Sequence, residues 1–375
     1  MASRPAFDYT VRMRSHPKGS QHVSRSRYVA FAVGGVLVVG LIGVLIYGIL
    51  TGRTRDFGGQ VTPTSTVPDV VVPPTSSVAL VPRRLDGVMV SSSVASLRPW
   101  AFMVDIQSDA RPAEGLPDAS VVIEAPVEGG ITRLLALFDP LTPTARIGAV
   151  RSARPYFVDW AGSWRAVFAH VGGSPEALDR LARTPSSTVL DVNEMTRGVS
   201  AFRRDAARVA PHQVFTTPER FGGFLGPVAT STVAFSSWRY TDDPVPTSTV
   251  GAVAPRIPYG GSYSVRWAYE ADRNAYRRVQ SGRALSSQPI YATNVVVIKT
   301  DSQVLDEAGR LRLRTTGGGE AVVYRDGKKL VGRWRRATGD AIAFTGTDGV
   351  DLMLRAGNTW IEVTTDDRVF AGLEL

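Results

Sequence analysis

The sequence contains no cysteine among its 375 residues. This absence excludes disulfide bonds, thiolate nucleophiles, cysteine-ligated zinc, iron–sulfur clusters and any lipid attached through a cysteine. Histidine is scarce as well: two of the four histidines lie within the first 27 residues, which leaves His170 and His212. No two potential ligands stand at a spacing typical of metal sites, so we predict neither a metal nor a cofactor.

The familiar catalytic signatures are also missing. The sequence has no HExxH, GxSxG, Walker A or GxGxxG pattern. Ser15 and Lys18 match the SxxK pattern of serine acyl enzymes, but they lie in a short basic tail, and we treat the match as chance. Motifs therefore identify no reaction, and they favour a protein that is not an enzyme without deciding the matter.

Basic residues exceed acidic ones, but the excess is uneven. The chain has 43 Lys and Arg against 34 Asp and Glu, a net charge of +9, and residues 1–27 contribute +5 of it. The rest of the chain carries only +4, which is too little for a broad surface that follows phosphates. We therefore predict no nucleic-acid partner.

One long hydrophobic run follows the basic tail. Residues 28–50 are 23 residues without a charge, enough for a helix to cross a hydrocarbon core of roughly 30 Å. The basic flank predicts a single-pass membrane protein with residues 1–27 in the cytoplasm and everything after residue 50 outside it. A cleaved signal peptide is the alternative, but its apolar region would span only about 7 to 15 residues.

The exterior part is expected to consist of a linker and two modules. Residues 51–80 are rich in Pro, Thr and Ser without a hydrophobic period, which is typical of an extended linker. We predict an N-terminal α+β module over residues 81–240 and a β-rich module over residues 241–375, separated by a proline-rich stretch.

The fold class follows from the patterns inside these modules. In the first, apolar runs alternate with two helix starts, Ser174-Pro175 and Thr217-Pro218, so we expect a mixed sheet with packed helices. The second has many short β-like runs and the turn signals Asp326-Gly327 and Asp348-Gly349, so we expect mainly antiparallel strands. The predicted strands cover residues 101–104, 121–123, 134–138, 166–169, 263–269, 294–299, 311–315, 320–324, 330–335, 341–345, 350–354 and 359–364.

A basic stretch lies within the second module. Residues 310–336 hold nine basic and two acidic residues that alternate with apolar ones, which would place positive charge on one face of a sheet. Such a face is either simply solvated or a docking surface for anionic polymers such as teichoic acid or phospholipid headgroups.

The densest polar constellation lies between residues 124 and 154. If Ser152 begins a helix, Arg151 and Arg154 flank its free backbone N–H groups, which outlines an anion site. The same guanidinium groups could instead pair with Glu124 and Glu128 as an internal ion-pair network. His170 follows an apolar run, where it could line a pocket or be fixed by a backbone partner.

Several strings, in order along the chain, resemble the YerB-like bacterial lipoprotein family. They are Arg98–Asp105, Asp109–Pro112, Ile123–Arg133, Arg146–Arg154, His170 with Gly173–Ala177, and Ala210–His212, followed by Tyr269–Arg277 and Gly357–Trp360. The resemblance covers about residues 83–365 and implies a membrane-attached, extracytoplasmic α+β protein of two modules, whose activity is not established for the family. Two departures stand out, the missing lipidated cysteine and Ile106 where the family's pattern has Asn.

The leading hypothesis is a membrane-anchored cell-envelope protein that binds or scaffolds an anionic ligand or a protein partner without catalysis. The expected partners are the membrane, an anionic wall polymer, a phosphate-bearing lipid or an envelope protein. The candidate ligand-binding residues are Asp105, Arg111, Arg133, Arg146, Arg151, Ser152, Arg154, His170, Ser174 and His212.

The alternative is an envelope polymer hydrolase or transferase. In it Glu124, Glu128 or His170 would be the catalytic acid or base while the arginines hold the substrate's charge. An enzyme needs such an acid or base in an open cleft, whereas a structural network buries both glutamates in arginine pairs. A third hypothesis, protein contacts alone, predicts an exposed apolar patch.

Overall fold

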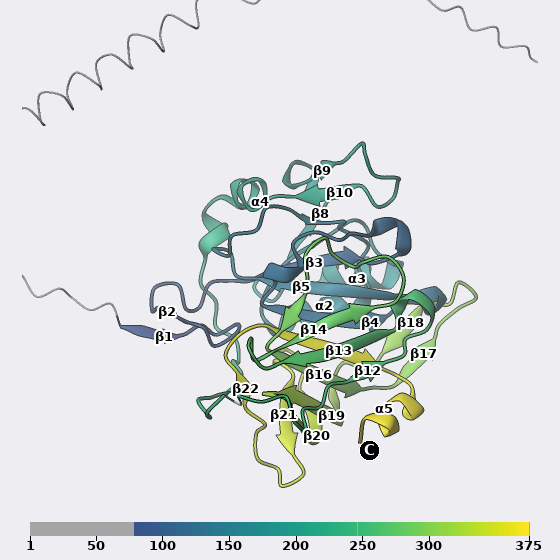
Figure 1. The fold of residues 1–375 in the computed structure, drawn as a ribbon. Coiled ribbons are helices and arrows are strands. Elements are labelled where there is room, and N and C mark those ends of the chain that lie inside the picture. Colours follow the sequence, from purple (N-terminus) through teal and green to yellow (C-terminus); the bar gives the residue numbers. More distant parts are fainter. Residues whose placement is uncertain (1–78, 246, 375) are drawn as a thin grey trace, which may run out of the picture. The chain divides into compact units, whose positions relative to one another are not determined.

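A ten-stranded mixed sheet organises residues 79–374, which, without residue 246, are the part of the chain that the computed structural model describes (Figure 1). From one edge to the other its strands are β21 (Ala343–Gly346), β20 (Lys328–Arg336), β19 (Gly317–Arg325), β16 (Asn294–Lys299), β23 (Thr359–Thr364), β4 (Val121–Pro126), β5 (Thr132–Phe138), β3 (Trp100–Asp105), β7 (Val167–His170) and β8 (Leu190–Asn193). The predicted tail, the predicted transmembrane helix over residues 28–50 and most of the linker lie outside the described residues.

Strand β23 joins the two halves of this sheet. It pairs in parallel with β16 on one side and with β4 on the other, so that Val296, Ile361 and Ile123 lie side by side. The strands after residue 241 are therefore continuous with those before residue 240, and the boundary between the two predicted modules runs inside one sheet.

Both faces of the large sheet are covered, because successive side chains of a strand point to opposite faces. Phe102 belongs to a hydrophobic core that also contains Trp267 from a second sheet, whereas Ala101 belongs to a core that contains Trp160 from a helix. The second sheet has four antiparallel strands, β12 (Arg256–Ile257), β13 (Val265–Glu270), β14 (Ala275–Gln280) and β15 (Tyr291–Ala292).

The other strands form small sheets. These are β1 (Leu80–Pro82) with β2 (Met89–Ser91), β6 (Ile147–Gly148) with β10 (Val214–Thr216) and β9 (Arg203–Arg204), β11 (Tyr240–Thr241) with β22 (Leu354–Arg355), and β17 (Ser302–Val304) with β18 (Leu311–Leu313). In the predicted strand over residues 350–354, Asp351 forms an isolated bridge with Thr345, and only the last residue belongs to β22.

The α-helices of the described part are α2 (Pro155–Ser163), α3 (Pro175–Arg183), α4 (Pro218–Leu225) and α5 (Asp367–Glu374). The predicted N-caps of two of them are confirmed, because the Ser174 hydroxyl accepts from the Ala177 amide and the Thr217 hydroxyl from the Arg220 amide, both at 3.3 Å. The expectation that Ser152 begins a helix is wrong. Helix α2 begins at Pro155, where a proline without an N–H is tolerated, and Arg154 is its N-cap.

The described part is thus mostly β, with few helices. Its large sheet is mixed, as predicted. The strands after residue 241 are mainly antiparallel, apart from the parallel partners of β22 and β23. Within residues 79–374, no helix has the length and apolar character needed to cross a membrane.

Candidate functional site

Asp105 lies at the end of β3, directly opposite Arg133 on β5. Its side chain is buried and accepts hydrogen bonds from His212 Nδ1 at 2.8 Å, Arg151 Nε at 3.0 Å and the Gln107 amide at 3.1 Å. Burial favours the neutral acid, but the hydrogen bond from His212 and the positive charge of Arg133 outweigh it and lower the pKa of Asp105. Asp105 is therefore a buried carboxylate that stays ionised and orients Arg151 and His212.

Arg133 is buried, with only 2% of its surface exposed. Its Nη1 donates to the Ser152 carbonyl at 2.8 Å, whereas its Nε has no hydrogen-bond partner among the described residues. Burial and the nearby charge of Arg154 lower the pKa of Arg133 to about 10. The guanidinium is still charged at neutral pH, although the described residues give it no direct ion pair.

Arg154 forms a two-point ion pair with Glu128, through Nε at 2.9 Å and through Nη2. Its Nη1 donates to the Ala153 carbonyl at 2.8 Å. Glu128 begins η3 (Glu128–Gly130), the turn between β4 and β5. Burial opposes ionisation of Glu128, but the hydrogen bonds and charge of Arg154 lower its pKa. Arg154 is thus largely committed to protein acceptors.

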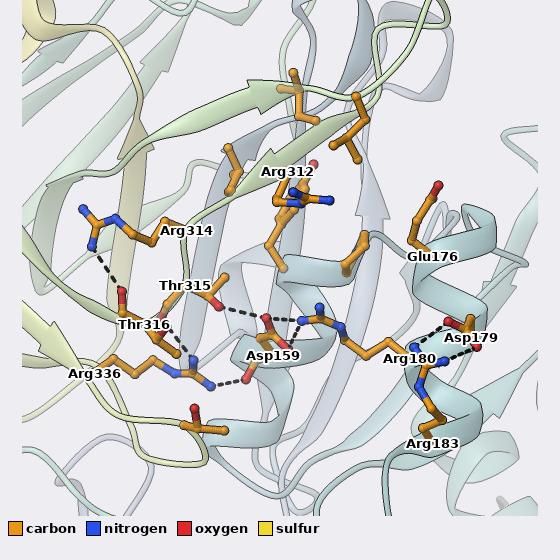
Figure 2. A pocket seen from close by; sticks show the side chains of 16 residues that line it. Asp159, Glu176, Asp179, Arg180, Arg183, Arg312, Arg314, Thr315, Thr316 and Arg336 are labelled. Atoms are coloured by element: carbon orange, nitrogen blue, oxygen red, sulfur yellow. Dashed lines mark hydrogen bonds and ion pairs between the residues drawn. The ribbon is translucent and has the colours of Figure 1, made fainter.

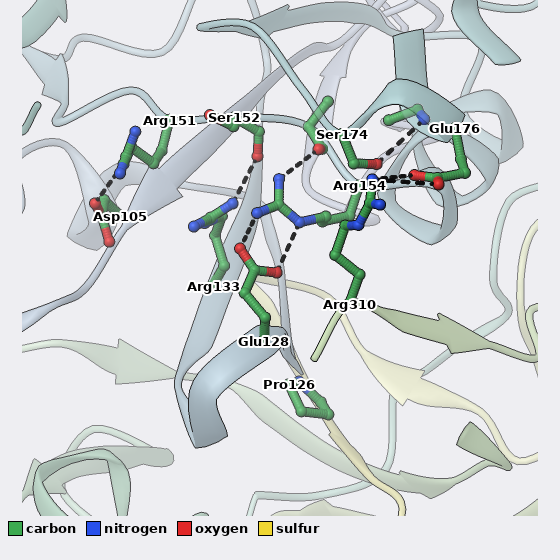
Figure 3. Close-up of polar contacts among 12 residues, drawn as sticks. Asp105, Pro126, Glu128, Arg133, Arg151, Ser152, Arg154, Ser174, Glu176 and Arg310 are labelled. Carbon is green, nitrogen blue, oxygen red and sulfur yellow. Dashed lines mark hydrogen bonds and ion pairs between the residues drawn. The ribbon is translucent and has the colours of Figure 1, made fainter. Parts of the chain in front are cut away.

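We call Arg133, Arg151, Arg154, Asp105 and Glu128 the arginine cluster (Figure 3). Its three guanidinium groups face two carboxylates, so one positive charge is left without a partner. The side chains of Arg151 and Glu128 are 22% and 26% exposed, so the cluster reaches solvent. Guanidinium groups arranged in this way can hold a phosphate or a carboxylate.

Glu124 lies away from the arginine cluster, although the sequence places it close by. It is buried and accepts from Thr132 Oγ1 at 2.6 Å and from Arg278 Nη2 at 2.5 Å. On the neighbouring strand β23, Glu362 lies beside it. Glu124 therefore belongs to a second polar group inside the protein.

Other candidate residues form hydrogen bonds or ion pairs with protein groups outside the arginine cluster. Arg111 is buried and donates to four backbone carbonyls, among them that of Ile106, whose side chain is in the core. Arg146 pairs with Asp205 at 2.6 Å. Ser174 lies beside Arg154, where its amide donates to the Ala153 carbonyl, but its hydroxyl caps α3.

The two histidines differ in their surroundings. His170 is buried and stacked on Phe168, and its ring nitrogens contact the Gly172 carbonyl at 2.6 Å and Asp191 Oδ1 at 2.7 Å. Of the two interpretations that the sequence left open for His170, the structure therefore favours a histidine fixed by a backbone partner over one that lines a pocket. The structure therefore brings Asp105, Arg133, Arg151, Ser152, Arg154 and His212 together with Glu128, and it leaves Glu124, Arg146 and His170 outside that group.

Glu362, Arg278, Trp267 and Tyr259, which surround Glu124 or contact one another, were not identified from the sequence. Their one local signal is an acid inside the otherwise apolar run of β23, Trp360-Ile361-Glu362-Val363, which predicts a buried carboxylate. A buried acid needs a partner, but the pattern does not say which one.

Comparison with known proteins gives two family matches. The model described as "Protein of unknown function (DUF3048) N-terminal domain" matches residues 85–226, and the model described as "Protein of unknown function (DUF3048) C-terminal domain" matches residues 255–361. Both matched segments contribute strands to the ten-stranded sheet.

A relative and a solved structure are similar over the same part. The chain is 28% identical over 295 residues to the Bacillus subtilis protein named "Putative lipoprotein YerB", which covers 75% of this chain and 86% of the relative. The crystal structure of the YerB protein from Bacillus subtilis is similar with a TM-score of 0.67 and 26% identity, over 76% of this chain and 97% of the solved one.

Proposed function

The chain belongs to the two-module YerB-like family, as the resemblance predicted, and from this premise we propose that it is an envelope protein that binds an anionic ligand at the arginine cluster. In this proposal the protein holds the ligand, an anionic wall polymer or a phosphate-bearing lipid, without transforming it.

The observation that carries the proposal is Arg133. A buried charge without an ion pair is costly, and proteins retain such groups where a ligand completes them. Arg133 is 2% exposed and its Nε lacks a partner among the described residues, while Arg151 beside it reaches solvent. An anion bound between Arg133 and Arg151 would supply the missing negative charge.

The glutamates do not enter this proposal as catalytic groups. Glu124 is fully buried against Arg278, and Glu128 forms its two-point pair with Arg154. Glu128 is partly exposed, but both carboxylates are committed to arginines, and neither is free to act as a general acid or base. The binding function is therefore favoured over hydrolysis or transfer.

The proposed location rests on the segments before residue 81. The name of the Bacillus subtilis relative describes a lipoprotein, but this chain lacks the cysteine that a lipid would need. We place residues 28–50 in the cell membrane, the tail in the cytoplasm and the linker and modules outside. A reporter enzyme that is active only outside the cytoplasm should work when fused after residue 375 and fail after residue 27, and the reverse pattern would contradict this topology.

Binding can be tested on the whole 375-residue chain in detergent and a phosphate-free buffer. Thermal unfolding is followed by tryptophan fluorescence with and without inorganic phosphate or pyrophosphate, because a ligand that binds the native state raises the melting temperature. We expect both anions to raise the melting temperature of the parent and to leave that of Arg151→Ala unchanged.

Two further variants make the result decisive. Arg133→Met removes the buried charge but keeps much of the side-chain volume, and it should abolish the stabilisation by anions while the ligand-free protein still unfolds cooperatively. Arg239→Ala removes an exposed arginine before β11 and should respond like the parent. If the parent gains no stability from either anion, or if Arg133→Met gains as much as the parent, the arginine cluster is not an anion site.

A further inference from the structure

A groove outside the arginine cluster is a feature that the proposed function leaves unused. It lies between helices α2 and α3 on one side and β18 with the following turn on the other, and it ends at Arg336 of β20 (Figure 2). Its volume is about 560 Å³, which is in the range of ligand sites. The groove thus combines residues from both family-matched segments.

The floor of the groove is fixed by a buried arginine. Arg336 is 5% exposed, and its nitrogens donate to the carbonyls of Asp159 at 2.5 Å and Thr315 at 3.1 Å. Nε also donates to the Ser163 hydroxyl at 2.8 Å and to the Asp340 carbonyl at 3.0 Å. All of these acceptors are neutral, so the charge of Arg336 has no carboxylate partner among the described residues.

The carboxylate nearest to this floor is committed to another arginine. Asp159 accepts from Arg180 on α3 and from the Thr315 hydroxyl at 2.8 Å. Figure 2 shows these contacts crossing the groove from helix to turn. They connect α2, α3 and the segment after β18 beside Arg336.

The walls carry more arginines than acids. Arg180, Arg183, Arg312, Arg314 and Arg336 line the groove together with Asp159, Glu176 and Asp179, an excess of two positive charges. Arg312 is exposed, and its Nη1 donates to a neutral amide oxygen, Gln303 Oε1, at 3.3 Å. Arg183 pairs with Asp179 on the same exposed helix face, where its side chain is 71% exposed. Both side chains are therefore available to a ligand.

The basic stretch predicted over residues 310–336 explains only one wall of this groove. In β20 the exposed Arg333 and Arg335 point away from the buried Trp334 and Arg336, so the basic residues lie on two faces of the sheet. Arg314 turns to the groove, where its Nε contacts Asp301 at 2.6 Å. The single positive face expected from the alternation is therefore not formed, and three of the nine basic residues, Arg312, Arg314 and Arg336, line the groove.

The mixture of groups indicates the chemistry of a ligand. A densely charged polyphosphate would be repelled by Glu176 and Asp179, whereas hydroxyl groups donate to carboxylates and to threonine oxygens. Arginines spaced along the walls match negative charges that recur at intervals. We propose that this groove binds a hydroxyl-bearing polymer with one negative charge per unit, either a polyol phosphate or a uronic-acid glycan.

This site is separate from the proposed anion site, although the two are neighbours. Tyr156 lines the groove and donates to the Pro126 carbonyl, two residues before Glu128. Glu176, on the groove wall, pairs with Arg310 at 3.3 Å in the same view as the arginine cluster (Figure 3). The groove proposal depends on neither Arg133 nor Arg151, so each site can fail alone.

The test measures the affinity of the detergent-solubilised 375-residue chain for three polymers of matched length. They are poly(glycerol phosphate), oligogalacturonate and a neutral maltooligosaccharide. We expect one or both charged polymers to bind, more weakly at high salt because the contacts are exposed charges, and the neutral one not to bind. The charged polymer that binds identifies the source.

Variants then locate the binding. The double variant Arg183→Ala/Arg312→Ala removes two exposed groups and should weaken the charged polymer at least about tenfold, a change of about 1.4 kcal/mol. Arg239→Ala should bind it as the parent does, and Arg151→Ala, which alters the neighbouring arginine cluster, is measured in parallel to tell the two sites apart. Equal affinity of parent and double variant, equal affinity for the neutral polymer, or no binding of either charged polymer would overturn the proposal. A loss seen only in Arg151→Ala would assign the polymer to the arginine cluster instead.

Discussion

At the residue scale, the least expected feature is a pair of buried carboxylates, only one of which has an arginine partner. Glu124 takes the ion pair with Arg278, while Glu362 on the next strand contacts Trp267 Nε1 and the Tyr259 hydroxyl, both at 2.9 Å. Burial and the negative charge of Glu124 raise the pKa of Glu362 to about 8. Glu362 is therefore protonated at neutral pH, while Glu124 forms the ion pair with Arg278.

This assignment predicts how stability depends on pH. Between the unfolded value of about 4.5 and the folded value of about 8, the native state holds a proton that the unfolded chain has released. The free energy of unfolding should therefore fall as the pH rises through this window, by up to about 1.4 kcal/mol per pH unit. Glu362→Gln keeps an acceptor for Trp267 and has no proton to lose, so it should remove this slope.

The measurement is a set of urea titrations of parent and variant between pH 5 and pH 8. The variant should gain stability relative to the parent towards pH 8. Glu307→Gln, at an exposed acid, serves as the control and should keep the parent's slope. Parallel curves for parent and Glu362→Gln would mean that Glu362 is ionised in the native protein.

The candidate residues that sequence reasoning grouped from spacing alone are those that neighbour one another along the chain. Arg151, Ser152 and Arg154 are consecutive or nearly so, and Asp105 and His212 came with the family resemblance. The arginine that pairs with Glu124 is 154 positions further along the chain. No local spacing predicts such a partner, because it depends on which strand of the second segment lies beside β4.

At the scale of elements, the first residues of helices were the easiest features to predict from the sequence. An N-cap hydrogen bond spans only three residues, so Ser174 and Thr217 could be recognised from the local sequence alone. Ser152 was misplaced because a proline three residues later offered a better first helical position. Strands were predicted well, but their neighbours were not, since pairing is a long-range choice.

The cap on α3 separates a structural role of Ser174 from a ligand-binding one. Ser174→Ala removes the hydroxyl that accepts from the Ala177 amide and should lower the free energy of unfolding by about 1 kcal/mol. The rise in melting temperature caused by phosphate should be unchanged, because the hydroxyl is occupied by the helix. Ser174→Asp should restore most of the stability, since aspartate also caps helices.

The same substitution at Thr217 on α4 is the matched control. Thr217→Ala removes an equivalent cap from a helix outside the arginine cluster, so both variants should lose similar stability and keep the phosphate response. A Ser174→Ala protein that is as stable as the parent but no longer responds to phosphate would place the hydroxyl on the ligand.

At the scale of the whole described part, the large sheet couples the two family-matched segments. β23 comes from the second segment, yet it has β4 of the first segment as a hydrogen-bonded neighbour. Without β23, an inner strand of the first segment would become an exposed sheet edge and both cores would lose a wall. The two segments should therefore unfold together, although the sequence suggested two modules joined by a connection.

Ile361 tests this coupling because it is buried at the centre of β23 between Val296 and Ile123. Ile361→Ala should lower the free energy of unfolding by about 2–5 kcal/mol through lost burial and the cavity left behind. Hydrogen exchange measured on peptides from β5 and from β19 should show the same loss of protection, because one cooperative unit opens as a whole. Val350→Ala, at a side chain that is 60% exposed, should leave both peptides unchanged. Loss of protection confined to β19 would mean that the segment around β3, β4 and β5 folds without its partner.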